Sequence, residues 1–125
     1  VGAAIQELDN PPEDFPVHGR DLLTGIPKQV IVTYVEIAAA LDKSISKIEE
    51  GIMKALESTP PELASDIYQK GLYLTGGGAL LRGLDKRISL KTKLPVQVAE
   101  DPLRAVVRGT GLALKNRHKY TFLLS

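Results

Sequence analysis

Three consecutive glycines, Gly76, Gly77 and Gly78, are the residues whose type and spacing most directly suggest chemistry in this chain. A β-favouring run, residues 72–75, precedes them and a helix-forming stretch follows, which predicts a turn at the carboxyl end of a strand. Open α/β sheets bind ligands at this end, and a backbone without side chains lets a flat or phosphorylated ligand approach closely. The pattern is neither GxGxxG nor a P-loop, because no Gly-Lys-Ser/Thr ending follows. A purely structural strand-to-helix turn is the alternative.

Two pairs of acidic residues are further candidates for acid–base or metal chemistry. Glu100 and Asp101 stand directly before Pro102. Capping of a helix is the simpler interpretation there, because Asp is a favoured N-cap and Pro a favoured first helical residue. Glu49 and Glu50 fall on the side of a helix whose other face is apolar, and we interpret both as solvated. Neither pair is predicted to be catalytic.

Histidines and basic residues give weaker signals. His18 and His118 lie far apart with no carboxylate or histidine at ligand spacing, and the chain has no cysteine. No metal site, disulfide or thiol nucleophile is therefore predicted, and no Ser/His/Asp arrangement is recognisable. The basic group of Lys115, Arg117, His118 and Lys119 is interpreted as a solvated face, with a weak phosphate or acidic-lipid patch as the alternative.

Composition places the chain among ordinary globular proteins. Of its 125 residues, 43% are hydrophobic and 25% are charged, which does not fit a disordered chain. A formal net charge of +1 offers no electrostatic case for nucleic acid, which calls for a basic face. No apolar run is long enough to span a bilayer and no signal peptide is visible, so we expect a cytoplasmic protein.

The first 33 residues have β character. Ala3 and Ile5 predict a first strand, residues 9–14 a turn-rich break, residues 15–19 a second strand and residues 26–34 a third. Apolar residues alternate in the third strand, which predicts antiparallel pairing with one face buried. The positions expected on that face are Ile26, Val30, Val32 and Tyr34. Because short connections favour pairing between neighbours, we expect a small antiparallel meander.

A long helix is predicted next. Thr33 and Glu36 have the spacing of a capping box at its start. Apolar residues then recur every three or four positions along one stripe. The stripe consists of Ile37, Leu41, Ile45, Ile48, Ile52 and Leu56. At 1.5 Å per residue the helix would be about 33 Å long, which suits a helix lying across a sheet.

Two later helices have start signals of the same kind. Thr59 as N-cap and Pro60 as first residue predict a short helix that ends near Gly71. Asp101 and Pro102 predict the start of the last helix.

A β-α-β-α unit is expected around the glycines. Residues 72–75 form its first strand, residues 83–91 its helix and residues 96–99 its second strand, and both strands are short and nearly continuously apolar, as covered parallel strands are. Residues 116–125 have no helical pattern, and residues 120–124 would form a docked strand, a frayed tail or a small membrane- or partner-binding patch. The predicted class is α/β: a small antiparallel meander, a long helix and the β-α-β-α unit.

Three segments resemble one known family. Residues 75–85, Thr-Gly-Gly-Gly-Ala-Leu-Leu-Arg-Gly-Leu-Asp, resemble the adenosine-binding segment of the actin superfamily in the variant found in the bacterial actin family MreB. Residues 59–67 upstream, and residues 98–103 followed by 107–109 downstream, also resemble MreB in the same order and spacing. The resemblance covers roughly residues 17–115. Actin, the heat-shock chaperones and FtsA share the Gly-Gly turn but not these flanks.

The resemblance implies a part of the actin-like ATPase fold, in which two similar lobes close on a nucleotide. Such a fold needs far more than 125 residues, Val1 is not an initiator methionine, and residues 2–7 resemble the middle of a strand. We therefore expect the C-terminal part of a longer protein. Residues 1–34 would be the remainder of a small β subdomain, and residues 35–125 an α/β subdomain with the glycine-rich loop.

The same resemblance implies that the whole protein binds and hydrolyses ATP, forms membrane-associated filaments and helps determine bacterial cell shape. Gly76, Gly77, Gly78, Ala79 and Leu80 would line the adenosine side of the nucleotide site. The phosphate loops, the aspartate that binds Mg²⁺ and the residue that positions water would lie outside this chain, so no catalytic residue or metal ligand is assigned here.

The partners implied are further copies of the protein and the shape-determining proteins MreC, MreD and RodZ. The inner membrane would be reached indirectly or through segments outside this chain, and nucleic acid is not expected. Two alternatives stay open: another ATPase of the superfamily, FtsA-like or chaperone-like, and a non-enzymatic interaction module with a glycine turn. Residues 60–64 and 100–103 argue against the first of these.

Overall fold

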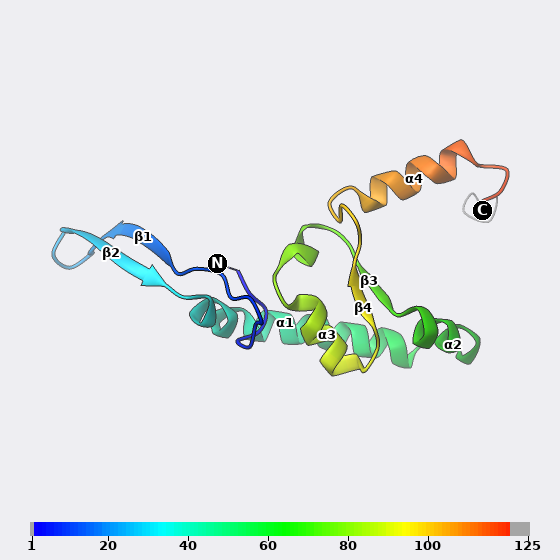
Figure 1. Cartoon of the computed structure of the whole chain (residues 1–125), viewed down its shortest axis with the longest axis horizontal. Coiled ribbons are helices and arrows are strands. Elements are labelled where there is room, and N and C mark those ends of the chain that lie inside the picture. Colours follow the sequence, from blue (N-terminus) through cyan, green and yellow to red (C-terminus); the bar gives the residue numbers. More distant parts are fainter. Residues whose placement is uncertain (1, 121–125) are drawn as a thin grey trace.

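The computed structural model describes residues 2–120. A β-hairpin, a helical body built on a small parallel sheet, and a projecting C-terminal helix are arranged along the longest axis (Figure 1). In chain order the elements are strands β1 (Phe15–Arg20) and β2 (Pro27–Val32), helices α1 (Tyr34–Glu57) and α2 (Pro61–Lys70), strand β3 (Leu72–Leu74), the 3-10 helix η1 (Gly77–Leu80), helix α3 (Leu84–Thr92), strand β4 (Val96–Val98) and helix α4 (Ala105–Lys115).

The hairpin confirms the antiparallel pairing of the second and third predicted strands, with Phe15 opposite Val32. Its turn is closed by the Asp21 carboxylate, whose Oδ1 accepts the N–H of Leu23 at 2.9 Å. The expected buried face is wrong, because Ile26 and Val30 are 63% and 52% exposed. The hairpin extends away from the helical body, so neither of its faces is covered there (Figure 1).

The first predicted strand is also wrong. Ala3 forms only an isolated parallel bridge with Arg82, and the N–H of Ala4 donates to the Arg82 carbonyl at 2.8 Å. Ala3 and Ala4 are fully buried, because their small side chains allow the N-terminal segment to run directly beside the chain that follows η1. The meander is therefore reduced to a two-stranded hairpin.

Helix α1 begins with the predicted capping box. Thr33 N–H donates to Glu36 Oε2 at 2.8 Å, and Glu36 N–H donates to Thr33 Oγ1 at 3.3 Å. The apolar stripe of α1 then supplies Ile45 to a core that also contains Ile88 and Leu84. Partly buried residues packed against this core are Leu41, Ile52, Leu72, Leu74, Leu81 and Val96.

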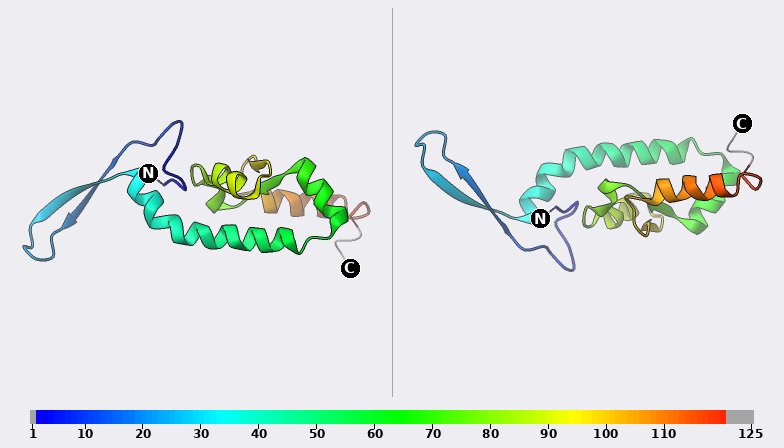
Figure 2. Two further views of the ribbon diagram at one scale, coloured as in Figure 1. Left: turned by 90° about the horizontal axis from the view of Figure 1, so that it is seen from below. Right: turned by 90° about the horizontal axis from the view of Figure 1, so that it is seen from above.

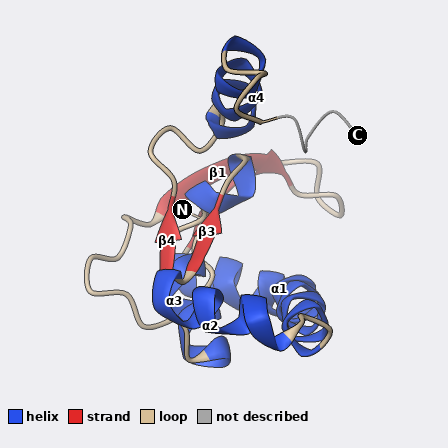
Figure 3. Cartoon of the chain, turned by 90° about the vertical axis from the view of Figure 1, so that its right-hand side faces the viewer, coloured by secondary structure: helices blue, strands red, loops and turns tan. Residues whose placement is uncertain are grey.

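The β-α-β unit is confirmed. Strands β3 and β4 pair in parallel, with Leu72 opposite Val96 and Leu74 opposite Val98. Helices α1, α2 and α3 gather on one side of this pair, and α4 lies on the other (Figure 3). Helix α1 runs along the body beside α3 and α2 (Figure 2). The carboxyl ends of β3 and β4, where the glycine-rich segment lies, are thus fixed by one shared core.

Two of the predicted helix caps are wrong. Helix α2 has Pro60 as its N-cap, because the hydroxyl of Thr59 instead donates to the carbonyl of Ala55 at the end of α1, at 2.8 Å. Helix α4 begins at Ala105, and Asp101 has a positive φ of 51°, which places it outside the helix. The prediction for residues 120–124 falls almost entirely outside the described residues. Within residues 2–120, no helix is both long and apolar enough to cross a membrane.

Candidate functional site

The glycine turn, residues 76–80, directly follows the carboxyl end of β3. Gly76 has φ 82°, a conformation that an L-residue adopts only with strain, so glycine is required there by the backbone. Gly77 and Gly78 have ordinary φ values and are exposed. A Cβ on Gly78 would have no heavy atom within 4 Å, and one on Gly77 would meet only Leu103 Cδ2 at 3.5 Å.

Backbone conformation therefore explains why residue 76 is a glycine. Packing does not explain why Gly77 and Gly78 are glycines. Within residues 2–120, neither the N–H of Gly77 nor that of Gly78 has a hydrogen-bond acceptor. The turn presents bare backbone with two free donors. This surface fits a ligand that approaches the main chain closely, as the sequence pattern suggested.

Ala79 and Leu80, the other two predicted site residues, differ in how far their side chains are exposed. Ala79 is 6% exposed, so its side chain belongs to the core and only its backbone is available to a ligand. Leu80 is 57% exposed. Together with Gly77 and Gly78 it lines an open groove of about 580 Å³. The other residues of the groove are Gly2, Ile45, Ile48, Leu81, Arg82 and Leu84.

A second loop, residues 99–104, lies against the glycine turn. Gly76 N–H donates to the Pro102 carbonyl at 2.7 Å, and Ala99 N–H donates to the Leu74 carbonyl at 3.0 Å. These bonds hold together the segments that follow the two parallel strands. Sequence reasoning missed this loop because it assigned Asp101 and Pro102 to a helix start; the tolerance of Asp for positive φ is the signal that was available.

Glu100 and Asp101, the acidic pair beside the site, do not act as a helix cap. Helix α4 has no side-chain cap bond, and Asp101 Oδ2 instead lies 3.8 Å from Arg104 Nε. The capping interpretation is wrong because the backbone of Pro102 is used by the glycine turn. No group of three or more His, Cys, Asp or Glu residues that could hold a metal ion exists within residues 2–120.

An ion-pair network under the site was also not predicted. Arg87 Nε donates to Glu49 Oε1 at 2.7 Å, Arg87 NH1 lies 2.8 Å from Asp42 Oδ1, and the same nitrogen donates to the Ala4 carbonyl at 3.1 Å. Glu49 is 8% exposed, so its interpretation as a solvated residue is wrong. The hydrogen bond that Arg87 donates to Glu49, helped by Asp42, raises the pKa of the Arg87 guanidinium above its ordinary value.

This network joins three segments that surround the glycine turn. Arg87 lies on α3, Glu49 on α1 and Ala4 on the N-terminal segment, so one side chain fixes all three relative to each other. The charge pair is separated by 38 residues, and such pairings are set by tertiary packing rather than by local pattern. The network is structural support, because its charged groups are already satisfied by each other.

Comparison with known proteins decides which family this arrangement belongs to. The sequence model of the family described as MreB/Mbl protein matches residues 1–121. The chain belongs to the MreB/Mbl family. Among curated relatives, the cell shape-determining protein MreB of Escherichia coli (strain K12) is 49% identical over 82% of this chain. The cell shape-determining protein Mbl of Bacillus subtilis (strain 168) is 43% identical over 86% of this chain.

Solved structures of the family have the same fold. The crystal structure of MreB5 of Spiroplasma citri bound to ADP superposes with a TM-score of 0.84 at 36% identity and covers 94% of this chain. The AMPPNP-bound structure of the same protein gives a TM-score of 0.83 at 35% identity over 99% of this chain. The expected class, a part of the actin-like ATPase fold, is confirmed.

The chain spans about a third of the proteins that it matches: 29% of the E. coli relative, 32% of the B. subtilis relative and 35% of the ADP-bound structure. The family match favours MreB over the FtsA-like and chaperone-like alternatives. The same match shows that this family is actin-like and cell shape-determining.

Proposed function

We propose that the glycine turn forms the adenosine side of an adenine-nucleotide site. The observation that carries this proposal is the open backbone at Gly77 and Gly78, exposed at the carboxyl end of a parallel strand with no internal requirement for glycine. The space that a Cβ would fill at Gly78 is the space that a flat base or ribose needs. Nucleotides in the two related Spiroplasma citri structures support the assignment.

In this proposal the chain lines one side of the nucleotide site and supplies no catalytic group. Gly76, Gly77, Gly78, Ala79 and Leu80 bind through backbone and apolar contact, since none of them carries a group that could act as base, nucleophile or metal ligand. ATP would be the nucleotide, with its phosphates and Mg²⁺ held by segments outside residues 1–125. Hydrolysis would depend on those segments, so this chain alone is expected to be inactive.

Membership of the family supports a proposal for the role of the whole protein. A protein built from this chain and the remaining two-thirds of the family fold would form cytoplasmic, membrane-associated filaments that help determine bacterial cell shape. Its partners would be further copies of itself and the shape-determining proteins MreC, MreD and RodZ. Residues 1–34 would belong to a small β subdomain and residues 35–125 to the α/β subdomain that carries the glycine turn.

The test replaces an open glycine by a residue that only a ligand would meet. In the complete gene product that contains this chain, Gly78→Val should weaken ATP binding at least about tenfold, which corresponds to about 1.4 kcal/mol. Gly51→Val is the matched control, because Gly51 on α1 is also exposed and a Cβ added there would have no heavy atom within 4 Å. Isothermal titration calorimetry measures both affinities.

Two results would contradict the proposal. Equal ATP affinity of Gly78→Val and the parent protein would make the turn purely structural. Micromolar ATP affinity of the 125-residue chain by itself would contradict the one-wall assignment, because a single wall offers too few contacts to offset the entropy lost on binding.

A further inference from the structure

The groove beside the glycine turn is lined by three parts of the chain that are distant in sequence. Its lining comes from the glycine turn with residues 81–84, from Ile45 and Ile48 on α1, and from Gly2 in the N-terminal segment, residues 2–8. No short connection joins these three parts. The shape of the groove therefore depends on the contacts that hold them together.

The N-terminal segment lies directly against the chain that follows the glycine turn. Ala4 N–H donates to the Arg82 carbonyl at 2.8 Å. The next residue of the turn region, Gly83, is approached so closely that a Cβ there would lie 2.9 Å from Ile5 Cγ1. A displacement of the N-terminal segment would thus act directly on the chain that forms the groove.

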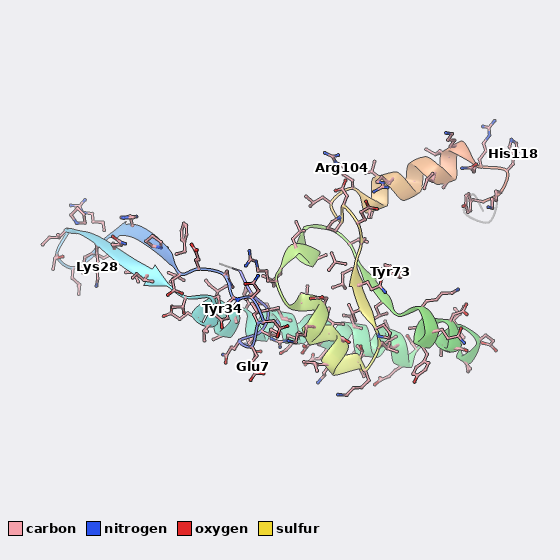
Figure 4. The ribbon with its side chains drawn as sticks, in the orientation of Figure 1. Glu7, Lys28, Tyr34, Tyr73, Arg104 and His118 are labelled. Atoms are coloured by element: carbon pink, nitrogen blue, oxygen red, sulfur yellow. The ribbon has the colours of Figure 1, made fainter. Side chains whose placement is uncertain are left out.

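The same segment is also held at the start of α1. The Tyr34 hydroxyl donates to the Gln6 carbonyl at 3.0 Å, and Figure 4 shows Glu7 and Tyr34 in the region where the segment passes the first turn of this helix. Gln6 follows Ala4 by two residues. The Ala4 carbonyl therefore lies between the bond to Arg82 and the bond to Tyr34.

Arg87 joins the Ala4 carbonyl to both helices. Arg87 Nη1 donates to this carbonyl at 3.1 Å. On α1, its Nε donates to Glu49 Oε1 at 2.7 Å and its Nη2 donates to Ser46 Oγ at 3.1 Å. Because a guanidinium holds its donors in a fixed planar arrangement, one side chain on α3 sets the distance between the N-terminal segment and the part of α1 that lines the groove.

We propose that Arg87 is a positioning residue for the nucleotide. Its bond to the Ala4 carbonyl sets the width of the groove beside the glycine turn, and hence how tightly the nucleotide is held. Arg87 lies outside the residues that line this groove, so it acts through the N-terminal segment. The inference rests on the proposed function and adds to it a residue that the glycine pattern does not reveal.

The affinity for ATP tests the inference, measured by isothermal titration calorimetry on the complete gene product that contains this chain. Arg87→Met should weaken ATP binding about fivefold, within the range by which residues away from a ligand alter its binding. Glu49→Met should bind ATP as the parent does even though it lowers stability, because Nη1 keeps its contacts with Asp42 and Ala4.

The double variant Arg87→Met/Glu49→Met separates positioning from charge. It removes one positive and one negative charge, so the overall electrostatic attraction for an anionic nucleotide is unchanged. It nevertheless lacks the bond to Ala4 and should lose affinity as Arg87→Met does. Lys86→Met is the matched control for a cation lost from α3, since Lys86 contacts Asp9 at 3.4 Å and should leave the affinity unchanged.

Hydrogen–deuterium exchange gives a second readout that needs no nucleotide. Residues 2–8 should exchange faster in the two variants that lack Arg87 than in the parent, because the bond between Ala4 and Arg82 opens more often. Glu49→Met controls for lower stability, and Lys86→Met controls for a lost cation. Both of these variants should keep the exchange of the parent in this segment.

Two results would overturn the inference while leaving the nucleotide site in place. One is an ATP affinity that follows the free energy of unfolding across these variants rather than the presence of Arg87, since Arg87 would then be merely structural. The other is unchanged exchange of residues 2–8 when Arg87 is lost. If Gly78→Val weakens ATP binding and Arg87→Met/Glu49→Met does not, the positioning role alone is wrong; if Gly78→Val has no effect, the proposed function is wrong and the inference falls with it.

Discussion

Replacing Arg87 should destabilise the fold more than any other single change of a charged residue described above. Its side chain is 16% exposed and bonds to Glu49, whose side chain is 10% exposed. Removing one partner of a buried pair leaves the other charge uncompensated, at a cost of about 3–5 kcal/mol. The Asp42 contact adds little, because Asp42 is 63% exposed and exposed pairs contribute about 0–1 kcal/mol. We expect Arg87→Met to cost about 3 kcal/mol.

A double-mutant cycle separates the buried pair from lost packing. Glu49→Met should also be costly, since it leaves Arg87 without its shortest contact, the 2.7 Å bond to Glu49 Oε1. The double variant Arg87→Met/Glu49→Met removes both charges, and replacing a whole buried pair by apolar residues is often neutral. Its cost should therefore be smaller than the sum of the two single costs by about 2 kcal/mol.

Urea unfolding followed by circular dichroism, with linear extrapolation to water, measures these free energies. Arg82→Met is the matched control, because Arg82 is exposed and its contact with the N-terminal segment runs through its carbonyl. That change should stay within about 0.5 kcal/mol. The reasoning would be refuted if Arg87→Met were no more costly than Arg82→Met, or if the two single costs were simply additive.

Two further predictions concern local backbone features. The hydrogen bond from the Thr33 N–H, assisted by the Thr33 hydroxyl, lowers the pKa of Glu36 below its ordinary 4.5; the stability that it gives is present above that pH and is lost as the pH falls through the folded-state pKa. An NMR titration should show this, and a Glu36 pKa at or above 4.5 would contradict it. Gly71→Ala should cost at least about 2 kcal/mol in urea unfolding, because Gly71 has φ 76° and a Cβ there would overlap the Pro95 carbonyl oxygen. Gly51→Ala, on an exposed helical site with open space, should instead stabilise by about 1 kcal/mol, and similar effects of the two changes would refute the assignment.

The features that could be predicted from the sequence are those decided by neighbouring residues. The capping box at Thr33 and Glu36 is complete within four residues, and its two bonds form as expected. Gly71 ends α2 with a positive φ, a conformation that glycine adopts readily. The β-α-β unit likewise follows from contiguous strand and helix signals on either side of the glycine turn.

The two helix caps that were predicted wrongly had local sequence signals as good as those of the capping box. Thr59 and Asp101 each precede a proline, but each has a competing interaction that the sequence does not show. The Thr59 hydroxyl reaches the Ala55 carbonyl of the preceding helix. Pro102 is held through its carbonyl by the N–H of Gly76, a contact between two loops, which keeps Asp101 outside α4. Long-range geometry decided both cases.

The candidate site likewise combines features decided by neighbouring residues with features decided by long-range packing. Its glycines are visible in the sequence, but the loop beside them and the Arg87–Glu49 pair depend on how distant segments pack. Periodicity placed Glu49 at the edge of the apolar stripe of α1, where a carboxylate is either solvated or paired. Only the position of Arg87 on α3 decides between these, and that position requires the fold.

The unfulfilled burial prediction for β2 has a different cause. Alternation in β2 predicts a buried face, yet Val30 is 52% exposed. The relatives are about three times as long as this chain, so they have further chain with which to cover such faces.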